Sequence, residues 1–168
     1  MAVAATTGVM LAVGDGGVVL RSGDTGATWT AATIAGAGDL QSIAMDAAGQ
    51  VVLAVDPSGA VWASGDAGVH FVREAMASAG LSMALADDDS AAVAAGLGGT
   101  VLERSPSGTW TPVASGTTAD LRAAVIADDG RQYVGGDVGT LEFSAGEGAS
   151  WTRVSLGTAA TLYALDDL

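Results

Sequence analysis

The chain has 168 residues, of which 49% are hydrophobic, and it carries 19 acidic side chains against 6 arginines, for a net charge of −13. This charge disfavours binding to nucleic acid or to an anionic membrane, and it favours cationic partners or simple solubility. The chain has no cysteine and no lysine, which excludes disulfides, thiolate metal sites, cysteine nucleophiles, and P-loop or Schiff-base chemistry.

A phrase of about forty residues occurs four times along the chain. Its first marker is a glycine before a short apolar strand, at intervals of 42, 40 and 40: Gly17, Gly59, Gly99 and Gly139. An aromatic residue follows each glycine after 12, 12, 11 and 12 positions: Trp29, Phe71, Trp110 and Trp151. A leucine gives a third marker in the same period: Leu40, Leu81, Leu121 and Leu162. Such a period indicates supersecondary units that bury their apolar faces by stacking on one another.

Each repeat predicts four short strands separated by glycine and aspartate turns. In the second repeat these strands cover residues 40–45, 51–55, 60–64 and 71–74. No segment sustains helical periodicity outside alanine-rich stretches, so we predict an all-β protein without a substantial helix. The hydrophobic content suffices for one core and no linker is evident, which predicts a single domain over residues 1–168.

A four-stranded meander repeated about an axis is typical of a β-propeller blade. We therefore predict a β-propeller of four four-stranded blades. The C-terminal strand, residues 161–168, is a fifth copy of the innermost strand, and we expect it to complete the first blade beside residues 9–13. In the competing arrangement residues 1–6 fill that place and the terminal strand reaches another subunit, so that chains combine into a larger ring.

The best copy of one turn reads Ser22-Gly23-Asp24-Thr25-Gly26-Ala27-Thr28-Trp29. We expect the Asp24 carboxylate to accept backbone N–H groups of its own turn, Gly26 to permit the bend, and Trp29 to pack between neighbouring sheets. Parts of this turn return in the later copies, at Ser64, Asp66, Gly68 and Phe71, then Trp110, then Ser144, Gly148 and Trp151. Because the third copy has lost its acid, we interpret the turn as a folding element and not as a site needing four carboxylates.

These strings, from Val13-Gly14-Asp15-Gly16-Gly17-Val18-Val19-Leu20-Arg21-Ser22 through Trp29, resemble the Asp-box, or bacterial neuraminidase repeat, β-propellers. The likeness is greatest to the branch that is similar to photosystem II assembly factors. Within that superfamily are sialidases, assembly chaperones, cell-surface proteins and bacteriophage virion accessories. The resemblance implies the fold and leaves the function open, and the related sialidases and assembly factors have more blades than this chain has repeats.

Two ends of the predicted propeller differ in composition. One end gathers acidic turns, with Asp24, Asp46, Asp66, Asp87, Asp88, Asp89, Asp128, Asp129, Glu147, Asp166 and Asp167. It predicts either a solvated rim or a cation or basic-partner site, although no recognised calcium loop is present. The other end has small neutral loops, with Met76 and Leu156 as apolar points for partner contact. Trp62 lies off the repeat phase and is a third candidate contact, expected to be exposed.

The sequence offers little for catalysis. His70, the single histidine, lies in the second copy of the turn, and the six arginines fall on different repeats and strand classes, so they do not predict the arginine triad of a sialidase. The glycine clusters 96–99 and 135–139 join two strands, and neither opens a helix at a phosphate site. We therefore predict no catalytic residue, no cofactor and no metal.

The preferred hypothesis is a non-enzymatic structural or interaction module in a larger assembly, with a bacteriophage virion accessory or decoration protein as its setting. One alternative is an assembly chaperone for a membrane complex, and another is a glycan-binding or sialidase-like domain. We expect protein partners, self-association through the terminal strand as one option, and neither nucleic acid nor membrane insertion. The first residues lack a basic region and a long apolar stretch, so no signal peptide is predicted and the protein is expected to be soluble, in a virion or the cytoplasm.

Overall fold

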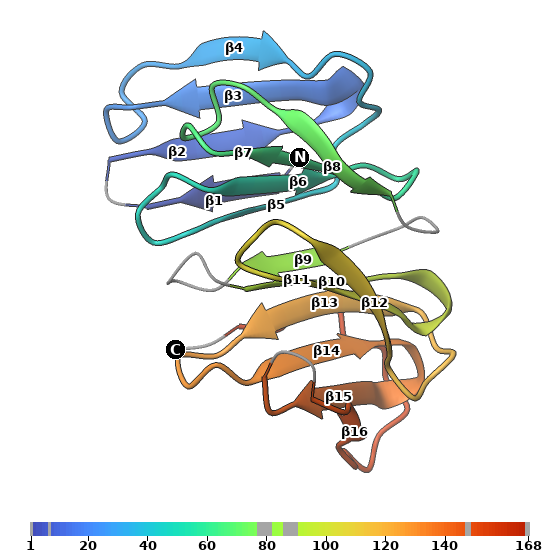
Figure 1. Ribbon diagram of the computed structural model, residues 1–168. Coiled ribbons are helices and arrows are strands. Elements are labelled where there is room, and N and C mark those ends of the chain that lie inside the picture. Colours follow the sequence, from blue (N-terminus) through green and yellow to red (C-terminus); the bar gives the residue numbers. More distant parts are fainter. Residues whose placement is uncertain (1, 7, 77–81, 86–90, 147–148, 167–168) are drawn as a thin grey trace. The chain divides into compact units, whose positions relative to one another are not determined.

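The computed structural model describes residues 2–6, 8–76, 82–85, 91–146 and 149–166, which form four separate four-stranded antiparallel sheets (Figure 1). In each sheet the strands lie in chain order, so every sheet is an up-and-down meander. Helical structure in this part of the chain is limited to three short 3-10 turns: η1 (Asp15–Gly17), η2 (Leu97–Gly99) and η3 (Asp137–Gly139). The all-β prediction of four four-stranded blades is confirmed at the level of the sheets.

The strand bounds follow the repeat closely. The first two sheets consist of β1 (Ala2–Ala5), β2 (Met10–Val13), β3 (Val18–Ser22) and β4 (Thr30–Thr33), then β5 (Ser42–Met45), β6 (Val52–Val55), β7 (Ala60–Ser64) and β8 (Val72–Met76). The other two consist of β9 (Ser82–Leu85), β10 (Ala92–Ala95), β11 (Thr100–Arg104) and β12 (Trp110–Ala114), then β13 (Leu121–Ile126), β14 (Gln132–Gly136), β15 (Thr140–Ser144) and β16 (Thr152–Arg153). In the second repeat each predicted strand boundary lies within two residues of the observed one.

The first sheet is completed by the N-terminal strand. β1 pairs antiparallel with β2, with Ala2 opposite Val13 and Ala5 opposite Met10. Residues 161–166 form no strand, so the prediction that the C-terminal strand completes the first blade is wrong. The N-terminal strand takes this place because it forms a hairpin with β2. The Thr6 N–H donates to the Val9 carbonyl across a very short loop, and closing such a loop costs little entropy.

The chain divides into two compact units, each containing two sheets. The first consists of Met1–Ala79 with Asp87–Asp89, and the second of Gly80–Ala86 with Ser90–Leu168. Each unit has its own buried apolar cluster. The expectation of a single domain over residues 1–168 stays a prediction.

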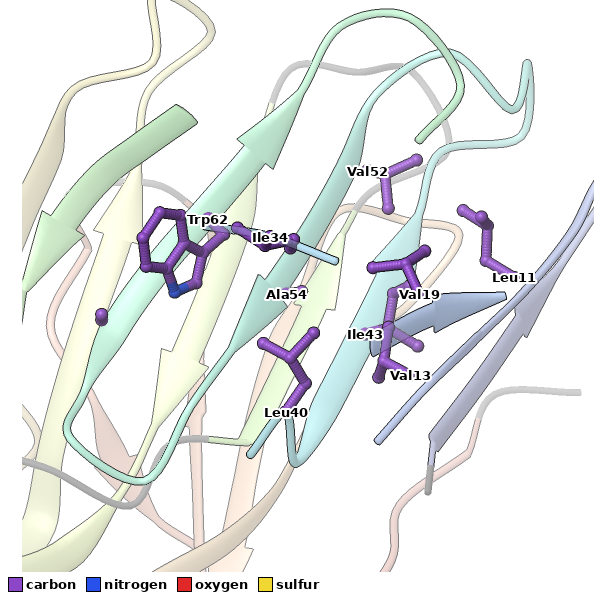
Figure 2. Packing of buried hydrophobic residues seen from close by; sticks show 10 residues of the cluster. Leu11, Val13, Val19, Ile34, Leu40, Ile43, Val52, Ala54 and Trp62 are labelled. Carbon is purple, nitrogen blue, oxygen red and sulfur yellow. The ribbon is translucent and has the colours of Figure 1, made fainter. Parts of the chain in front are cut away.

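The core of the first unit lies between its two sheets. Leu11 and Val13 of β2 are fully buried and share one cluster with Ile43 of β5 and with Val52 and Ala54 of β6, as Figure 2 shows. All four residues of β6 are buried, and Val52 and Ala54 are the two that belong to this cluster. Full burial of one Val or Leu side chain contributes roughly 1.5–3 kcal/mol, and neither sheet obtains it alone.

Trp62 of β7 belongs to this core. Its side chain is only 7% exposed, and its indole N–H donates to the Asp56 Oδ2 at 3.1 Å. The expectation that Trp62 is an exposed contact is therefore wrong. Trp62 pairs with Ala54 across the sheet, and this register places its side chain on the face that is covered by the first sheet. Burial raises the pKa of Asp56, but the hydrogen bonds from Ser58 and Trp62 outweigh it and lower the pKa overall.

The second unit repeats this arrangement. Val93 and Val101 of the third sheet cluster with Leu121, Val134 and Trp151 of the fourth sheet. The Trp151 indole N–H donates to Glu103 Oε1 at 3.3 Å, in the preceding sheet. The aromatic landmark of the fourth repeat is thus covered by the repeat before it.

One backbone hydrogen bond ties the start of a repeat to the sheet before it. The leucine marker donates its N–H to the carbonyl of a glycine that precedes a 3-10 turn: Leu40 to Gly14 at 2.9 Å, Leu121 to Gly96 at 3.0 Å, and Leu162 to Gly136 at 2.9 Å. Leu81, the remaining marker, lies outside the described residues. Leu162 therefore begins a fifth repeat in the same way as Leu40 and Leu121 begin theirs.

Adjacent glycines in the turn η2 give a matched test of this packing. Gly98 and Gly99 both have positive φ, of 63° and 74°, but a methyl group at Gly99 would lie 2.0 Å from the Thr117 carbonyl oxygen, whereas at Gly98 it would meet open space. Val138, with φ of 58°, occupies the position of Gly98 in the fourth repeat. We expect Gly98→Ala to cost about 1–2 kcal/mol through its backbone conformation, and Gly99→Ala to cost more than about 4 kcal/mol through the added clash.

Urea unfolding of both variants measures this difference. Equal losses of stability for the two substitutions would contradict the close approach of residues 115–117 to η2.

Candidate interaction surface

The turn after β3 is closed around Asp24. Its carboxylate Oδ1 accepts the Thr28 N–H at 2.8 Å and the Ser22 hydroxyl at 2.7 Å, and Oδ2 accepts the Thr28 hydroxyl at 2.6 Å. Gly26 has a φ of 88°, which a residue without a side chain adopts at little cost. The predicted hydrogen bonds and bend are present, while the assignment of this turn to the Asp-box class stays a prediction.

In the second copy His70 takes the place of Thr28. Asp66 accepts the His70 N–H at 2.8 Å, and its Oδ2 lies 2.6 Å from His70 Nδ1. The imidazole is 84% exposed and serves as a partner within its own turn. This single histidine therefore faces a structural carboxylate.

In the other two copies the described residues include a serine hydroxyl that bonds within the turn. Ser105 Oγ accepts the Thr109 N–H at 3.2 Å in the third, and the Ser144 hydroxyl donates to the Gly146 carbonyl at 2.8 Å in the fourth. Gly148 lies outside the described residues. A serine hydroxyl therefore contributes to both turns, and the third copy has no acidic residue.

The aromatic landmarks differ in exposure. Trp151 is 9% exposed and Phe71 packs against the core of the first unit, but Trp29 is 42% exposed. The expectation that Trp29 packs between neighbouring sheets is wrong. Phe71 and Trp151 each follow a sheet of their own unit that covers them, whereas the sheet that holds Trp29 is the first of its unit.

The side of the first sheet that faces away from the second sheet of its unit, which we call the rear face, consists of Met10, Ala12, Val18, Leu20 and Trp29. Ala12 and Leu20 pair directly across β2 and β3, and Val18 is 36% exposed. A methyl group at Gly26 would lie 3.2 Å from Met10 Sδ and 3.9 Å from the Trp29 ring, so these two side chains flank the same small space. A hollow of about 350 Å³ lies beside Ala12, Val18 and Leu20.

The side of the fourth sheet that faces away from the third sheet of its unit, which we call the forward face, consists of the partly buried residues Val125, Tyr133, Leu141 and Phe143. Val125, Tyr133 and Phe143 are cross-strand neighbours in β13, β14 and β15, and the rings of Tyr133 and Phe143 lie 6.2 Å apart. A hollow of about 490 Å³ adjoins them, and its rim carries Asp128, Asp129 and Asp166. The forward face is thus an apolar, partly aromatic surface with an acidic edge.

Repeat positions show what kind of surface this is. Tyr133 lies six residues before Gly139, as Leu11 does before Gly17 and Val93 before Gly99. Leu11 and Val93 are fully buried in the clusters that join consecutive sheets of the two units. The forward face of the fourth sheet therefore presents the positions that the first and third sheets use to cover the sheet after them.

The C-terminal segment lies along one part of the forward face. A methyl group at Gly135 would lie 3.3 Å from Leu162 and 3.4 Å from Leu165. Arg122 donates to both oxygens of Asp137, at 2.6 and 2.8 Å, and its guanidinium lies 6.0 Å from the centre of the Tyr163 ring. The Arg122 hydrogen bonds lower the pKa of Asp137 and raise that of Arg122.

The predicted acidic residues lie in different surroundings. Asp46 is fully buried and caps its own turn by accepting the Gln50 and Val51 N–H groups. Asp128, Asp129 and Asp166 line one hollow. Five of the predicted acidic residues lie outside the described residues: Asp87, Asp88, Asp89, Glu147 and Asp167. Within the described ranges no three acidic or histidine side chains gather closely enough to hold a metal ion.

The three residues predicted to contact a partner have different outcomes in the structure. Leu156 is 41% exposed, the Met76 side chain lies outside the part of the chain that the structure describes, and Trp62 is buried. The residues that the sequence analysis missed are Tyr133, Leu141 and Phe143. A signal existed for Phe143, because the same repeat position holds Arg21, Ala63 and Glu103 in the other copies.

Comparisons with known proteins agree with this architecture. Neither a family model nor a curated protein matches the chain. Among solved structures, that of U3-55K aligns with a TM-score of 0.78 at 9% identity, over 90% of this chain and 50% of that one. YCF48 from Cyanidioschyzon merolae aligns with a TM-score of 0.68 at 14% identity, over 98% of this chain and 58% of that one. The chain has a β-propeller fold.

An enzyme is also among the structural neighbours. The GH74 enzyme from Niastella koreensis has a TM-score of 0.69 at 22% identity, over 91% of this chain but 24% of that one. At these sequence identities the similarity shows the fold and not the function. The chain spans about half the length of U3-55K and YCF48. Among the described residues, no helix has the length and apolarity needed to cross a membrane.

The two carboxylate turns predict how stability depends on pH. Hydrogen bonds from the Thr28 hydroxyl, the Thr28 N–H and Ser22 lower the pKa of Asp24 from 3.8 to about 2. The N–H and side chain of His70 and the Ser64 hydroxyl hold the pKa of Asp66 well below its usual range. Both carboxyls bind protons less tightly in the folded protein, so their contribution is complete above pH 3.8 and is lost as the pH falls towards 2 and below.

Thermal unfolding followed by circular dichroism over this pH range tests the assignment. We expect the melting temperature of the wild type to fall as the solution is acidified, and the double variant Asp24→Asn/Asp66→Asn to show a flatter fall. Ser105→Ala, in the turn without an acid, is the control and should lower the melting temperature by a similar amount at each pH. A double variant as acid-sensitive as the wild type would speak against the carboxylate turns.

Proposed function

We propose that this chain is a non-enzymatic β-propeller module that binds a protein partner within a larger assembly. The forward face carries this proposal, because it combines the Tyr133 and Phe143 rings, Leu141 and a hollow of about 490 Å³ on a sheet with no following sheet in its unit. Aromatic residues in apolar pockets contribute most of the energy of many protein interfaces. Contiguous apolar surface on a folded protein commonly marks such a contact.

The non-enzymatic character is supported by what the polar side chains contact. His70 faces the turn carboxylate of Asp66, and Arg21 donates to the Ala67 carbonyl oxygen at 2.8 Å. Arg122 pairs with Asp137, and Arg153 lies 3.5 Å from Glu142. Each of these arginines has its own structural partner, which argues against the convergent arginine cluster that a sialidase uses.

The setting we favour is a bacteriophage virion, with the chain as an accessory or decoration protein. It rests on the resemblance to a repeat class found on virions and on an acidic chain that is suited to protein partners and not to nucleic acid. Trp29 and the rings of Tyr133 and Phe143, which no other sheet of their own units covers, also suit a component that is built into a particle.

A second candidate is an assembly factor that holds a segment of its client. YCF48 has been solved bound to a D1 peptide, and that structure aligns with a TM-score of 0.67 at 15% identity, over 94% of this chain and 53% of that one. The hollow on the forward face, with three carboxylates at its rim, suits a peptide with apolar and basic side chains. The glycan-binding alternative has less support, because Trp62, on which its exposed groove depended, is buried.

The test is incorporation into particles purified from the source of the chain. We expect the wild type to co-sediment with virions in a fixed ratio to the capsid protein, measured by quantitative mass spectrometry. Phe143→Asp should reduce this ratio by about tenfold or more, corresponding to roughly 1.4 kcal/mol of lost contact energy. Val72→Arg changes an exposed residue of β8 that is 68% accessible, and it should leave the ratio unchanged.

Absence of the wild-type chain from purified virions would remove the virion setting. Equal incorporation of Phe143→Asp and wild type would exclude the forward face as the contact. Recovery of the chain with a membrane complex under assembly would favour the second candidate, and binding on a glycan array would favour the third.

A further inference from the structure

We propose that Glu142 is a proton-controlled joint between the third and fourth sheets: its neutral carboxyl group donates a hydrogen bond to the Gln132 side-chain oxygen and tightens the layer between the sheets, and its ionised form loosens that layer. The joint lies inside the second unit, which contains both sheets. It goes beyond the proposed function, because it concerns what holds two sheets together and not what either sheet binds.

Glu142 is a buried acid on the side of β15 that faces the third sheet. It pairs across the sheet with Val134, which is fully buried in the cluster that joins the third and fourth sheets. Direct cross-strand partners lie on the same side of a sheet, so Glu142 belongs to this layer. The residue is only 2% exposed. A carboxylate in such a place loses most of its water, and its charge is costly unless other groups replace that water.

Arg153 offsets this cost only in part. Its Nη1 lies 3.5 Å from the Glu142 Oε1, which is longer than an ordinary hydrogen bond between charged groups. The Arg153 side chain is 52% exposed, so water competes with the carboxylate for its charge. The pair formed by Arg122 and Asp137 is much closer, with two bonds of 2.6 and 2.8 Å. Glu142 therefore has a weaker counter-charge than Asp137, although it is the more deeply buried acid.

The side-chain oxygen of Gln132 needs a hydrogen-bond donor. Gln132 is 1% exposed, and its Oε1 has no hydrogen-bond partner among the described residues. Gln132 pairs with Ser144 and Glu142 pairs with Val134, so Gln132 and Glu142 stand diagonally across β14 and β15 on the same side of the sheet. Diagonal positions are about 7–8 Å apart, within reach of two long side chains.

Protonation of Glu142 supplies the missing donor. An ionised carboxylate can only accept hydrogen bonds, whereas a neutral carboxyl group has one O–H to give. A buried acceptor left without a donor lowers stability, because it has given up its bonds to water. One proton therefore removes a buried charge and satisfies the Gln132 oxygen at the same time.

Glu103 brings a second acid to the same layer from the third sheet. It pairs with Val93, which belongs to the cluster shared by the two sheets, and it is 7% exposed. Its Oε1 accepts the Trp151 indole N–H at 3.3 Å, a bond that crosses the layer. Trp151 is therefore a natural reporter of how tightly the two sheets are closed.

The charges of this layer favour protonation of one acid. The described strands of the two sheets place Glu103, Glu142 and Arg153 on it. Arg104 follows Glu103 directly and so lies on the other side of β11. Arg122 forms its ion pair beyond the end of β14. Two acids thus share the layer with one half-exposed arginine.

The dependence on pH has a definite direction. Burial raises the pKa of Glu142 above its ordinary value of 4.5, and the charge of Arg153 opposes this rise without cancelling it. The stability that protonation contributes is therefore complete below pH 4.5 and is lost as the pH rises through the pKa of the folded protein. The contributions of Asp24 and Asp66 are lost in the opposite direction, below pH 3.8, so the two effects occupy separate ranges.

The experiment follows the carboxyl carbon of Glu142 by NMR as a function of pH, in a chain with ¹³C-labelled glutamate. Loss of the signal in Glu142→Gln assigns it. We expect a wild-type midpoint above 4.5. Gln132→Met keeps the length of the side chain but removes the acceptor, so it should lower the midpoint. Arg153→Gln removes the opposing charge and should raise it. Arg131→Gln, which alters an exposed pair with Asp129, is the control and should leave the midpoint unchanged.

A second measurement tests the strength of the joint itself. Glu142→Gln keeps the neutral shape of the protonated side chain at every pH. In urea unfolding, the unfolding equilibrium constant of the wild type relative to this variant should rise about threefold or more between about pH 4 and about pH 7. The hydrogen-exchange protection factor of the Trp151 indole N–H should rise in the wild type as the solution is acidified through the midpoint, and it should stay constant in Glu142→Gln. Circular dichroism checks that each variant is folded.

A Glu142 midpoint at or below 4.5 in the wild type would overturn the inference. An unchanged midpoint in Gln132→Met would do the same. A higher midpoint in that variant would show that the amide donates to the ionised carboxylate, which is the reverse of the proposed bond. A stability ratio or a Trp151 protection factor that does not depend on pH would contradict the joint. Both wild-type measurements decide the matter even where a variant does not fold.

Discussion

The structure depends on one constraint: each sheet has apolar faces that only another sheet can cover. β6 shows this at Val52 and Ala54, which are fully buried in the cluster that β6 shares with the first sheet. Leu11 and Val93 cover the following sheet in their units, and Trp62 and Trp151 fill the layers between sheets. A chain built in this way is stabilised by contacts between neighbouring repeats.

The proposed function follows from the apolar faces that no other sheet of the same unit covers. The first and fourth sheets have the same alternation of inward and outward residues as the others, yet Trp29 and the pair of Tyr133 and Phe143 lie on faces that nothing in their own units covers. The chemistry of these faces suits another protein surface and not a small polar substrate. The carboxylates of Asp24 and Asp66 are occupied with closing turns, and the structure gives them a folding role.

Much of the fold was accessible from the sequence, because glycine, aromatic and leucine markers in one period fix where each strand begins. The errors concern which surface covers which residue. Trp62 lies off the repeat phase but faces a neighbouring sheet through its cross-strand register, while Trp29 lies in phase but has no sheet before it in its unit. Neither position is encoded within one repeat. Likewise, periodicity cannot decide whether the N-terminal strand or the C-terminal segment pairs with β2.

The central claim, that consecutive sheets cover each other through equivalent residues, is tested most directly by nuclear Overhauser effects in solution. The account predicts strong cross-peaks between the Leu11 methyl groups and the Gly68 α-protons, and between the Trp151 indole N–H and the Glu103 side chain. The claim would be contradicted if amide cross-peaks within the four sheets were observed but both of these inter-sheet cross-peaks were absent. The sheets would then form without covering one another.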